Sequence, residues 1–299
     1  MTRKVYELIT KEIIGELEKG SIPWDRPWTF GKHRNLKSKK HYRGINQFLL
    51  NHRAAQNGFT SNWWLSYKQA KALGGQVRKG EKGQRIIFWN WTEKEVENEN
   101  SETEKKRYAF LRYYTVFNLD QVDNIEAPTE EKRTFTPIEQ AENIVVNMLN
   151  PPALIHAKQD RACYSPLRDS VTMPLREQFK SESGYYSVLF HELGHSTGHE
   201  SRINRPSVVD GSYFGTEKYS KEELLAEMTA AFLMGGCGII QETRHNSAAY
   251  IQSWLKVLKN DNKFVVQAAS AAQKAADFIL GIDWDHLHEE DQNIPEETE

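Results

Sequence analysis

The pentapeptide His191-Glu192-Leu193-Gly194-His195 constrains this 299-residue chain more than any other feature. Residues four apart on a helix share one face, so His191 and His195 can bind the same metal ion. Glu192 lies between them, where it can accept a proton from a water that the metal activates. The apolar run that precedes the motif is typical of a buried helix. The pattern predicts an active-site helix over about residues 183–198.

A catalytic zinc usually has three protein ligands and one open position, so the two histidines need a partner. The segment Glu222 to Phe232 resembles the second helix of gluzincin-type peptidases, in which a glutamate is a ligand and a carboxylate four residues later orients a ligand histidine. This resemblance implies Glu223 as the third ligand and Glu227 as its supporting carboxylate.

Three alternatives stay open for these residues. His199 could be a ligand, although a helix-end position or a substrate contact suits it better. Glu223 could merely cap its own helix, because Ser220-x-x-Glu223 is also a capping box. The whole motif helix could be structural and free of metal.

Zinc is the expected ion at a site with two histidines and one carboxylate, but Mn²⁺ or Co²⁺ would also suit these ligands. Glu192 would then act as the general base of metal-assisted hydrolysis. The segment 162–174 is predicted to be an extended edge strand, given its prolines, and to align a peptide. The peptide itself is not evident from the sequence.

The charge of the chain is divided unequally between its two halves. Residues 1–90 carry 18 Lys and Arg against 6 Asp and Glu, a charge of +12, whereas residues 91–299 carry 21 against 35, a charge of −14. Residues 26–85 hold 14 basic residues and a single acid, Glu81. Because surfaces usually mix the two signs, this asymmetry predicts a polyanionic partner for the first half only.

Aromatic residues accompany this positive charge, since six of the eight tryptophans lie within the first 91 residues. Cations that follow phosphates and aromatic rings that stack on bases are what single-stranded nucleic acid requires. Trp63, Trp64 and Trp89 alternate with apolar residues and are expected in the core. The residues predicted to contact DNA are Arg34, Lys37, Lys39, Lys40, Tyr42, Arg43, Asn46, Lys79 and Lys82.

Periodicity and turn residues predict a two-domain α+β protein. In the first domain, residues 1–127, we expect a helix over 5–19, a short helix over 66–73 and two paired strands, 85–91 and 108–117, separated by a polar loop. In the second domain, residues 136–285, a capping box at Thr136 opens a helix to about Leu149, and further helices are expected over 221–235, 247–259 and 263–280. An acidic tail, 286–299, follows.

The composition excludes a membrane-spanning protein, because no window approaches 18 uninterrupted apolar residues. The first residues lack the apolar segment of a signal peptide. The two cysteines, Cys163 and Cys237, have no metal-like spacing, which suits a reducing cytosol. A cytoplasmic location is therefore expected.

Taken together, the motifs resemble the ArdC-type antirestriction proteins of conjugative plasmids, whose first domain also begins some conjugative primases. The motifs that carry the resemblance are Pro23-Trp24-x-x-Pro27-Trp28, Tyr42 to Asn46, Trp64 to Ala70, Val77 to Gly83, Tyr164 to Pro174, His191 to His199 and Glu222 to Phe232. The resemblance implies a first domain that binds single-stranded DNA without sequence preference and a zincin-like metallopeptidase domain. It also implies that the protein protects incoming DNA from host restriction.

Two further functions remain compatible with the sequence. The chain could be a zinc metalloprotease that DNA binding delivers to DNA-bound proteins, or a single-stranded-DNA-binding protein whose metal site is purely structural. Host restriction enzymes or another protein are the candidate protein partners. The restriction systems concerned and the oligomeric state are not evident from the sequence.

Overall fold

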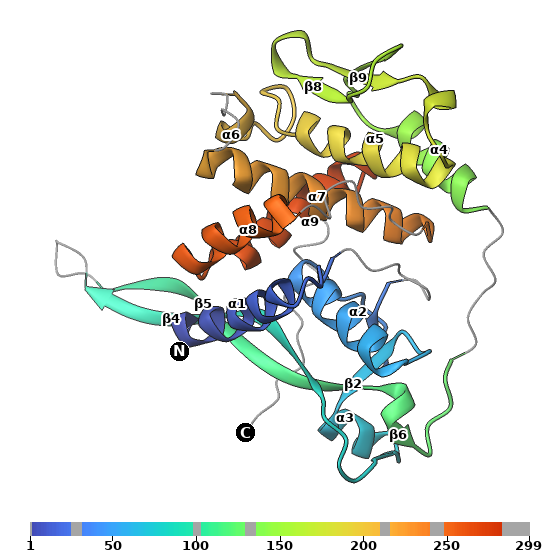
Figure 1. Ribbon diagram of the computed structural model, residues 1–299. Helices are drawn as coiled ribbons and strands as arrows, with labels where there is room; N and C mark the ends of the chain where they lie inside the picture. The colour runs from blue at the N-terminus through green and yellow to red at the C-terminus, as the bar shows by residue number, and fades with distance from the viewer. Residues whose placement is uncertain are drawn as a thin grey trace. The chain divides into compact units, whose positions relative to one another are not determined.

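The computed structural model describes residues 2–24, 32–97, 103–128, 136–209, 216–239 and 248–282 (Figure 1). The chain forms two compact units, each with helices and strands, so the predicted two-domain α+β class is confirmed. One unit comprises residues 1–131 and 248–267, and the other comprises 132–247 and 268–299. Within the described ranges no helix is long and apolar enough to cross a membrane. The predicted acidic tail, 286–299, lies outside the described residues.

The first unit is built on a four-stranded sheet with the strand order β1-β2-β5-β4. Its strands are β1 (Arg34–Asn35), β2 (Trp63–Ser66), β4 (Gln84–Glu97) and β5 (Thr103–Asn118). β1 is parallel to β2, and the other neighbours are antiparallel. Two short strands, β3 (Gln76–Val77) and β6 (Val122–Asp123), form a separate antiparallel pair. A 3-10 turn at Leu119–Gln121 precedes β6.

The β4–β5 hairpin is longer than the sequence predicted. The polar segment 93–107 was expected to be a loop, but the paired register continues as far as Glu97 opposite Thr103. Backbone N–H and C=O groups hold paired strands together, and every polar or apolar residue other than proline supplies both groups. Low sequence complexity was therefore a poor guide to the end of these strands.

Both faces of the sheet carry a small core, because successive side chains of a strand point to opposite faces. On one face, Trp64, Ile86 and Val116 pack with Leu50 and with Ala54 of α2 (Ile45–Asn57). On the other face, Trp63 and Leu65 pack with Ala70 of α3 (Tyr67–Ala72).

The burial of the tryptophans tests part of the sequence prediction. Trp63 and Trp64 are buried, which confirms the expectation that they belong to the core. The same expectation was wrong for Trp89, which is 46% exposed and meets Tyr6 in a T-shaped arrangement with 6.4 Å between ring centroids.

The first unit is completed by two helices that lie far apart in the sequence. α1 (Thr2–Glu18) buries Ile9, Ile13 and Leu17 and ends before Gly20, as predicted. It packs with α8 (Ala248–Asn260), and Lys259 pairs with Glu18 at 2.6 Å. The fully buried ring of Trp254 meets that of Trp24 with 5.5 Å between centroids.

By these contacts the two compact units divide the chain differently from the predicted domains. The sequence placed residues 136–285 in one continuous second domain, whereas residues 248–267 complete the core of the first unit. A fragment that ends at residue 127 would therefore lack the partner of Trp24.

The second unit begins with α4 (Pro137–Asn147), whose capping box joins Thr136 and Glu139 as predicted. Its three-stranded sheet has the order β7-β9-β8, formed by β7 (Ala153–Ala157), β8 (Cys163–Ser165) and β9 (Ser170–Pro174). The prediction of one edge strand over 162–174 was wrong, because a 3-10 turn at Pro166–Arg168 divides the segment. β9 lies in the middle of the sheet, and β8, like β7, is an outer strand.

The remaining helices hold the motif residues. α5 (Glu182–Ser196) carries the pentapeptide, follows a 3-10 turn at Arg176–Gln178, and packs against α7 (Glu217–Cys237). The short α6 (Pro206–Val209) and the long α9 (Phe264–Ile279) complete the set. α5 and α7 approach closely at Gly194, where an added Cβ would lie 3.3 Å from Ala226 Cα and 3.2 Å from Thr229 Cβ.

Candidate functional site

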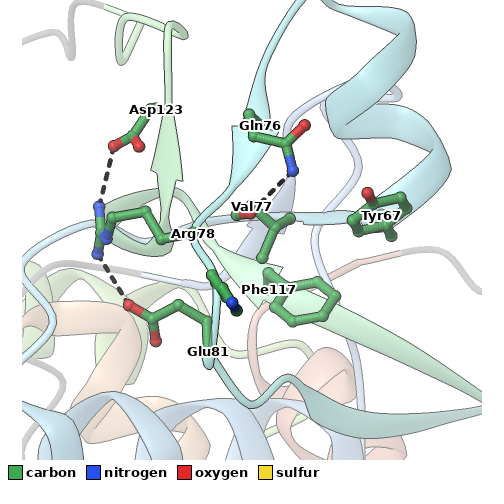
Figure 2. Close-up of a pocket in the computed structure, with 8 residues that line it drawn as sticks. Tyr67, Gln76, Val77, Arg78, Glu81, Phe117 and Asp123 are labelled. Atoms are coloured by element: carbon green, nitrogen blue, oxygen red, sulfur yellow. Dashed lines mark hydrogen bonds and ion pairs between the residues drawn. The ribbon is translucent and has the colours of Figure 1, made fainter.

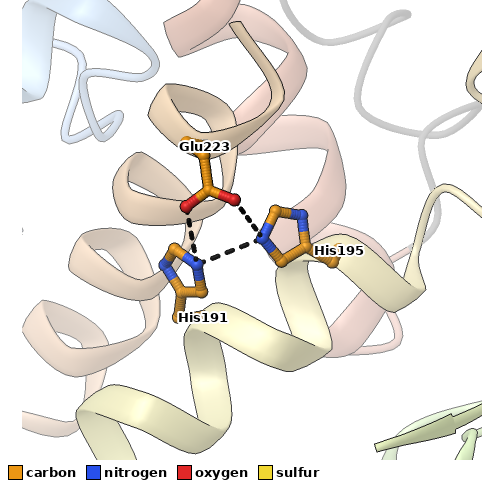
Figure 3. Close-up of side chains that lie close together, drawn as sticks. All are labelled: His191, His195 and Glu223. Atoms are coloured by element: carbon orange, nitrogen blue, oxygen red, sulfur yellow. Dashed lines mark hydrogen bonds and ion pairs between the residues drawn. The ribbon is translucent and has the colours of Figure 1, made fainter. Parts of the chain in front are cut away.

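Three side chains from α5 and α7 converge in the second unit (Figure 3). The Nε2 atoms of His191 and His195 lie 3.1 Å apart. One carboxylate oxygen of Glu223 lies 3.5 Å from His191 Nε2, and the other lies 3.5 Å from His195 Nε2. The structure therefore brings together the three residues that the sequence predicted as metal ligands.

These separations match the geometry of a tetrahedral metal centre. Zinc binds imidazole nitrogen and carboxylate oxygen at about 2.1 Å, so two ligand atoms at tetrahedral corners lie about 3.4 Å apart. The three separations of 3.1, 3.5 and 3.5 Å enclose that value. The arrangement suits one divalent ion, with a corner left open for water or substrate.

Two further carboxylates stand behind the histidines. Glu227 Oε1 lies 3.4 Å from His191 Nδ1, the position predicted for a supporting carboxylate. Glu222 Oε1 lies 3.4 Å from His195 Nδ1, which the sequence analysis missed. Such partners fix the orientation of a ligand imidazole and increase its basicity.

Glu222 is itself held from the opposite side. The Nη2 atom of Arg205 donates to Glu222 Oε1 at 2.6 Å, and Ser207 also donates to this carboxylate. Arg205 additionally donates to the carbonyl of Gly194. The segment after the motif helix thus ties Glu222 to the end of α5.

The surroundings of the histidines favour positive charge. Burial opposes protonation of both rings, but hydrogen bonds to Glu223 and Glu227 outweigh it and raise the pKa of His191 well above its usual value. The equivalent bonds to Glu222 and Glu223 raise the pKa of His195 to about 9. Burial also opposes ionisation of Glu223, yet the two histidines hold the pKa of its carboxyl far below the usual range. Because a divalent cation can replace these protons, the same carboxylates favour metal binding.

The outer strand of the small sheet lies beside the motif helix. β8 packs against α5, and Glu192 is buried at 6% exposure. The pKa of the Cys163 thiol in β8 is raised, mainly by burial and also by the negative charge of Glu192. This places the outer strand close to the predicted general base.

The structure argues against two of the alternative roles. His199 is not part of the cluster found among the described residues, and its Nδ1 accepts from the backbone N–H of Ser201 at 3.2 Å. Glu223 does not cap its helix, because α7 begins at Glu217 and the hydroxyl of Thr216 accepts from Tyr219 N as the N-cap.

An ion pair fixes the turn between β8 and β9 to the region after α5. The buried guanidinium of Arg202 binds both carboxylate oxygens of Asp169 and donates to the carbonyl of Ser196 at 2.8 Å. Burial opposes ionisation of Asp169, but hydrogen bonds from Arg202 and Tyr164 outweigh it and lower the pKa of that carboxyl. The outer strand is thereby held against the end of the motif helix.

Most of the residues predicted to contact DNA lie at the surface of the first unit. The exposed ones are Lys37, Lys39, Lys40, Lys79 and Lys82, and Arg34 and Arg43 are partly exposed. Arg34 and Lys39 lie over the ring of Trp63, at 4.1 and 4.8 Å from its centroid. Arg34 and Lys39 therefore lie close together beside Trp63.

Tyr42 and Asn46 do not fit the predicted role. Both are 5% exposed. The Asn46 amide accepts from Ile87 N at 2.8 Å and donates to Ile87 O at 2.7 Å, which satisfies the free edge of β4. The Tyr42 hydroxyl accepts from Asn35, and burial raises its pKa above the usual range. These two side chains stabilise the fold, and their assignment to DNA contact is corrected.

A shallow pocket in the same unit lies beside Lys79 and is lined by Tyr67, Val77 and Phe117 (Figure 2). Its arginine, Arg78, pairs with Glu81 at 3.0 Å and with Asp123 at 3.3 Å. The positive charge of Arg78 is therefore neutralised within the protein, and the pocket itself is not strongly basic.

Comparison with known proteins defines both units. Residues 139–271 match the model of a family of zincin-like metallopeptidases, and residues 3–117 match the N-terminal domain of anti-restriction factor ArdC. The fold and the site thus define a zincin-like domain that follows an ArdC-type N-terminal domain.

Solved structures are similar over most of the chain. The metal-free crystal structure of the antirestriction protein ArdC from plasmid R388 is 36% identical, with a TM-score of 0.76, and the match covers 92% of this chain and 96% of that one. The Mn(II)-bound structure of that protein is 35% identical with a TM-score of 0.72, covering 92% and 97%. The chain belongs to the ArdC antirestriction family.

Curated relatives include proteins of very different length. The protein y4eC of Sinorhizobium fredii is 34% identical over 92% of this chain and 91% of its own length. Two Escherichia coli proteins named DNA primase TraC are 33% and 36% identical over 95% of this chain. The chain spans only 28% and 20% of the length of these primases.

Proposed function

We propose that this protein binds single-stranded DNA without sequence preference and protects incoming plasmid DNA from host restriction, with a metal-dependent peptidase-like centre in its second unit. The observation that carries the proposal is the convergence of His191, His195 and Glu223 at tetrahedral spacing within a chain of the ArdC family. The cations gathered on the first unit support the DNA-binding part.

The ligands fit a zinc ion, although manganese would also suit them, and the related ArdC was solved with Mn(II). When bound, the ion would act as a Lewis acid that makes water nucleophilic near neutral pH. Glu192 would accept the proton of that water, since it is the motif carboxylate without a role as ligand. Glu227 and Glu222 would orient His191 and His195.

The outer strand β8 would align an extended peptide, because its free edge offers backbone hydrogen bonds beside the motif helix. Its position is fixed by the Asp169–Arg202 pair described above. This supports a second function, a metalloprotease that DNA binding delivers to DNA-bound proteins, with host restriction enzymes among the candidate substrates.

A Glu192→Gln variant tests whether hydrolysis underlies protection. The substitution keeps the size of the side chain and removes its ability to accept a proton, so the fold and metal binding should persist. The assay is survival of unmodified plasmid DNA on entry into a restricting host, with Glu200→Gln, an exposed residue after the motif helix, as matched control. Loss of protection with Glu192→Gln alone is the expected result.

Full protection by the Glu192→Gln variant, with metal bound, would show that hydrolysis is not the mechanism. The metal site would then be structural, and DNA binding would carry the function. Cleavage of a DNA-bound protein by the wild type, stimulated by single strands and absent in the variant, would instead favour the protease function.

A further inference from the structure

We propose that one face of the β4–β5 hairpin is the surface on which bases of single-stranded DNA stack. The proposal rests on the proposed DNA binding of the first unit and names the part of that unit that holds the bases. The surface, termed here the aromatic face, consists of Phe88, Tyr108, Phe110, Arg112 and Tyr114.

The register of the hairpin places these side chains on one face. Arg112 lies opposite Phe88, Phe110 lies opposite Asn90, and Tyr114 lies opposite Ile86. Alternate residues of a strand lie about 7 Å apart on one face, so Tyr108, Phe110, Arg112 and Tyr114 form a row along β5. The guanidinium of Arg112 lies 5.3 Å from the centroid of the Phe110 ring.

This face is exposed at Tyr108 and Arg112, whereas Phe88 and Tyr114 pack against the core cluster that includes Trp64 and Ile86. Tyr108 is 44% exposed, Arg112 is exposed, and Phe88, Phe110 and Tyr114 are partly exposed. On the opposite face, Ile87 and Leu111 are buried at 5% and 0%, whereas Trp89 and Tyr113 are 46% and 50% exposed. A row of aromatic side chains that keep part of each ring exposed along one strand can stack with bases.

The charge around the face is complementary to a polyanion. Neither β4 between Gln84 and Thr92 nor β5 between Tyr108 and Phe117 contains Asp or Glu. The side chain of Arg112 is exposed on this face. Its guanidinium can therefore contact a phosphate or a base.

The aromatic face also adjoins the segment from Arg34 to Arg43. Tyr42 packs against Phe88 with 6.3 Å between ring centroids. Its neighbour His41 pairs through its backbone with Arg34. Burial lowers the pKa of His41, and the positive charges of Lys32, Arg34 and Arg43 lower it further. A strand stacked on the face can thus run toward several cations.

Two variants and a control on the same strand test the assignment in the full-length protein. Tyr108→Ala removes an exposed ring, and Phe110→Leu removes a ring while keeping its apolar volume. Tyr113→Ala removes a ring that is 50% exposed but points to the other face of β5. Each lost stack is expected to weaken the binding of a single-stranded oligonucleotide by roughly 5- to 150-fold, and the Tyr113 variant should bind like the wild type.

Photo-crosslinking gives an answer that does not depend on the folding of a variant. An oligonucleotide with 5-iododeoxyuridine, irradiated with the wild-type protein, should attach to Tyr108 or Phe110. Wild-type affinity of both variants, or crosslinks confined to other residues, would overturn the aromatic face while leaving DNA binding intact. Failure of the wild type to bind any single strand would overturn the proposed function itself. A tenfold preference for RNA of the same sequence would overturn single-stranded DNA as the ligand.

Discussion

The supporting carboxylate Glu227 gives the sharpest test of the metal centre. Its Oε1 atom lies 3.4 Å from His191 Nδ1, and its side chain is only 6% exposed, so solvent screens it little. Glu227→Gln keeps the size of the side chain and an acceptor oxygen but removes the negative charge. Loss of such a partner typically weakens metal binding by about 10- to 100-fold. This corresponds to roughly 1.4–2.7 kcal/mol of binding free energy.

The assay is a competition titration of Zn²⁺ or Mn²⁺ between the metal-depleted protein and a chromophoric chelator. It is best carried out at several pH values, because removal of Glu227 also lowers the pKa of His191 and so reduces competition by protons. Glu217→Gln, an exposed position at the start of the same helix, is the matched control. Equal affinity of the wild type, Glu227→Gln and Glu217→Gln at every pH would refute the assignment of Glu227.

Four further outcomes are expected. Arg43→Ala should weaken single-strand binding and reduce the slope of log affinity against log salt by about 0.7. Anisotropy titrations at two or more salt concentrations measure this slope. An unchanged slope would remove Arg43 from the DNA-binding surface. Gly194→Val should lower the free energy of unfolding by about 1–3 kcal/mol in urea melts and weaken metal binding. The reason is that α5 and α7 leave no room for the added side chain. Unaltered stability would contradict the close approach of α5 to α7 at Gly194. The lowered pKa of Asp169 adds stability at neutral pH, and this stability is lost as the pH falls through about 4 and below. In melts over that pH range, Asp169→Asn should therefore lose less stability than the wild type. Metal removal by a chelator should lower the melting temperature of the wild type more than that of His195→Ala, and equal shifts would place the bound metal elsewhere.

The sequence predicted the elements whose signals are local. The helix of the pentapeptide, the capping box at Thr136 and the helix ending before Gly20 all depend on residues within one or two turns of each other. The spacing of His191, His195 and Glu223 was also accessible, because two helical residues four apart share a face and the acidic helix resembles a known pattern.

The sequence did not reveal features that depend on distant contacts. Trp254 joins the core of the first unit by packing against Trp24, more than two hundred residues away, and no local pattern encodes that choice. Tyr42 and Asn46 lie in a basic motif but turn inward, because Asn46 bonds to the free edge of β4 and Tyr42 packs in the core beside Trp64 and Ile86. Only the pairing of the strands distinguishes these buried residues from their exposed neighbours.

Glu222 shows a signal that was present but not used. It directly precedes Glu223, and a second carboxylate in that helix could have suggested a partner for the second histidine. Its role depends on Arg205 and Ser207, which follow the motif helix in an irregular segment, so the sequence alone could not fix its orientation. The aromatic face was hidden for a similar reason, since the alternation of β5 has meaning only once its register with β4 is known.

The central claim is that the first unit binds single-stranded DNA while the second holds a metal centre, and a fluorescence anisotropy titration of the full chain tests it most directly. The same sequence should be offered as a single strand and as a duplex, at low and at physiological salt. The account predicts preferential binding of the single strand, weakened by salt, with or without metal. No binding of either form at low salt would contradict it, and would leave the peptidase-like centre as the only function that the structure supports.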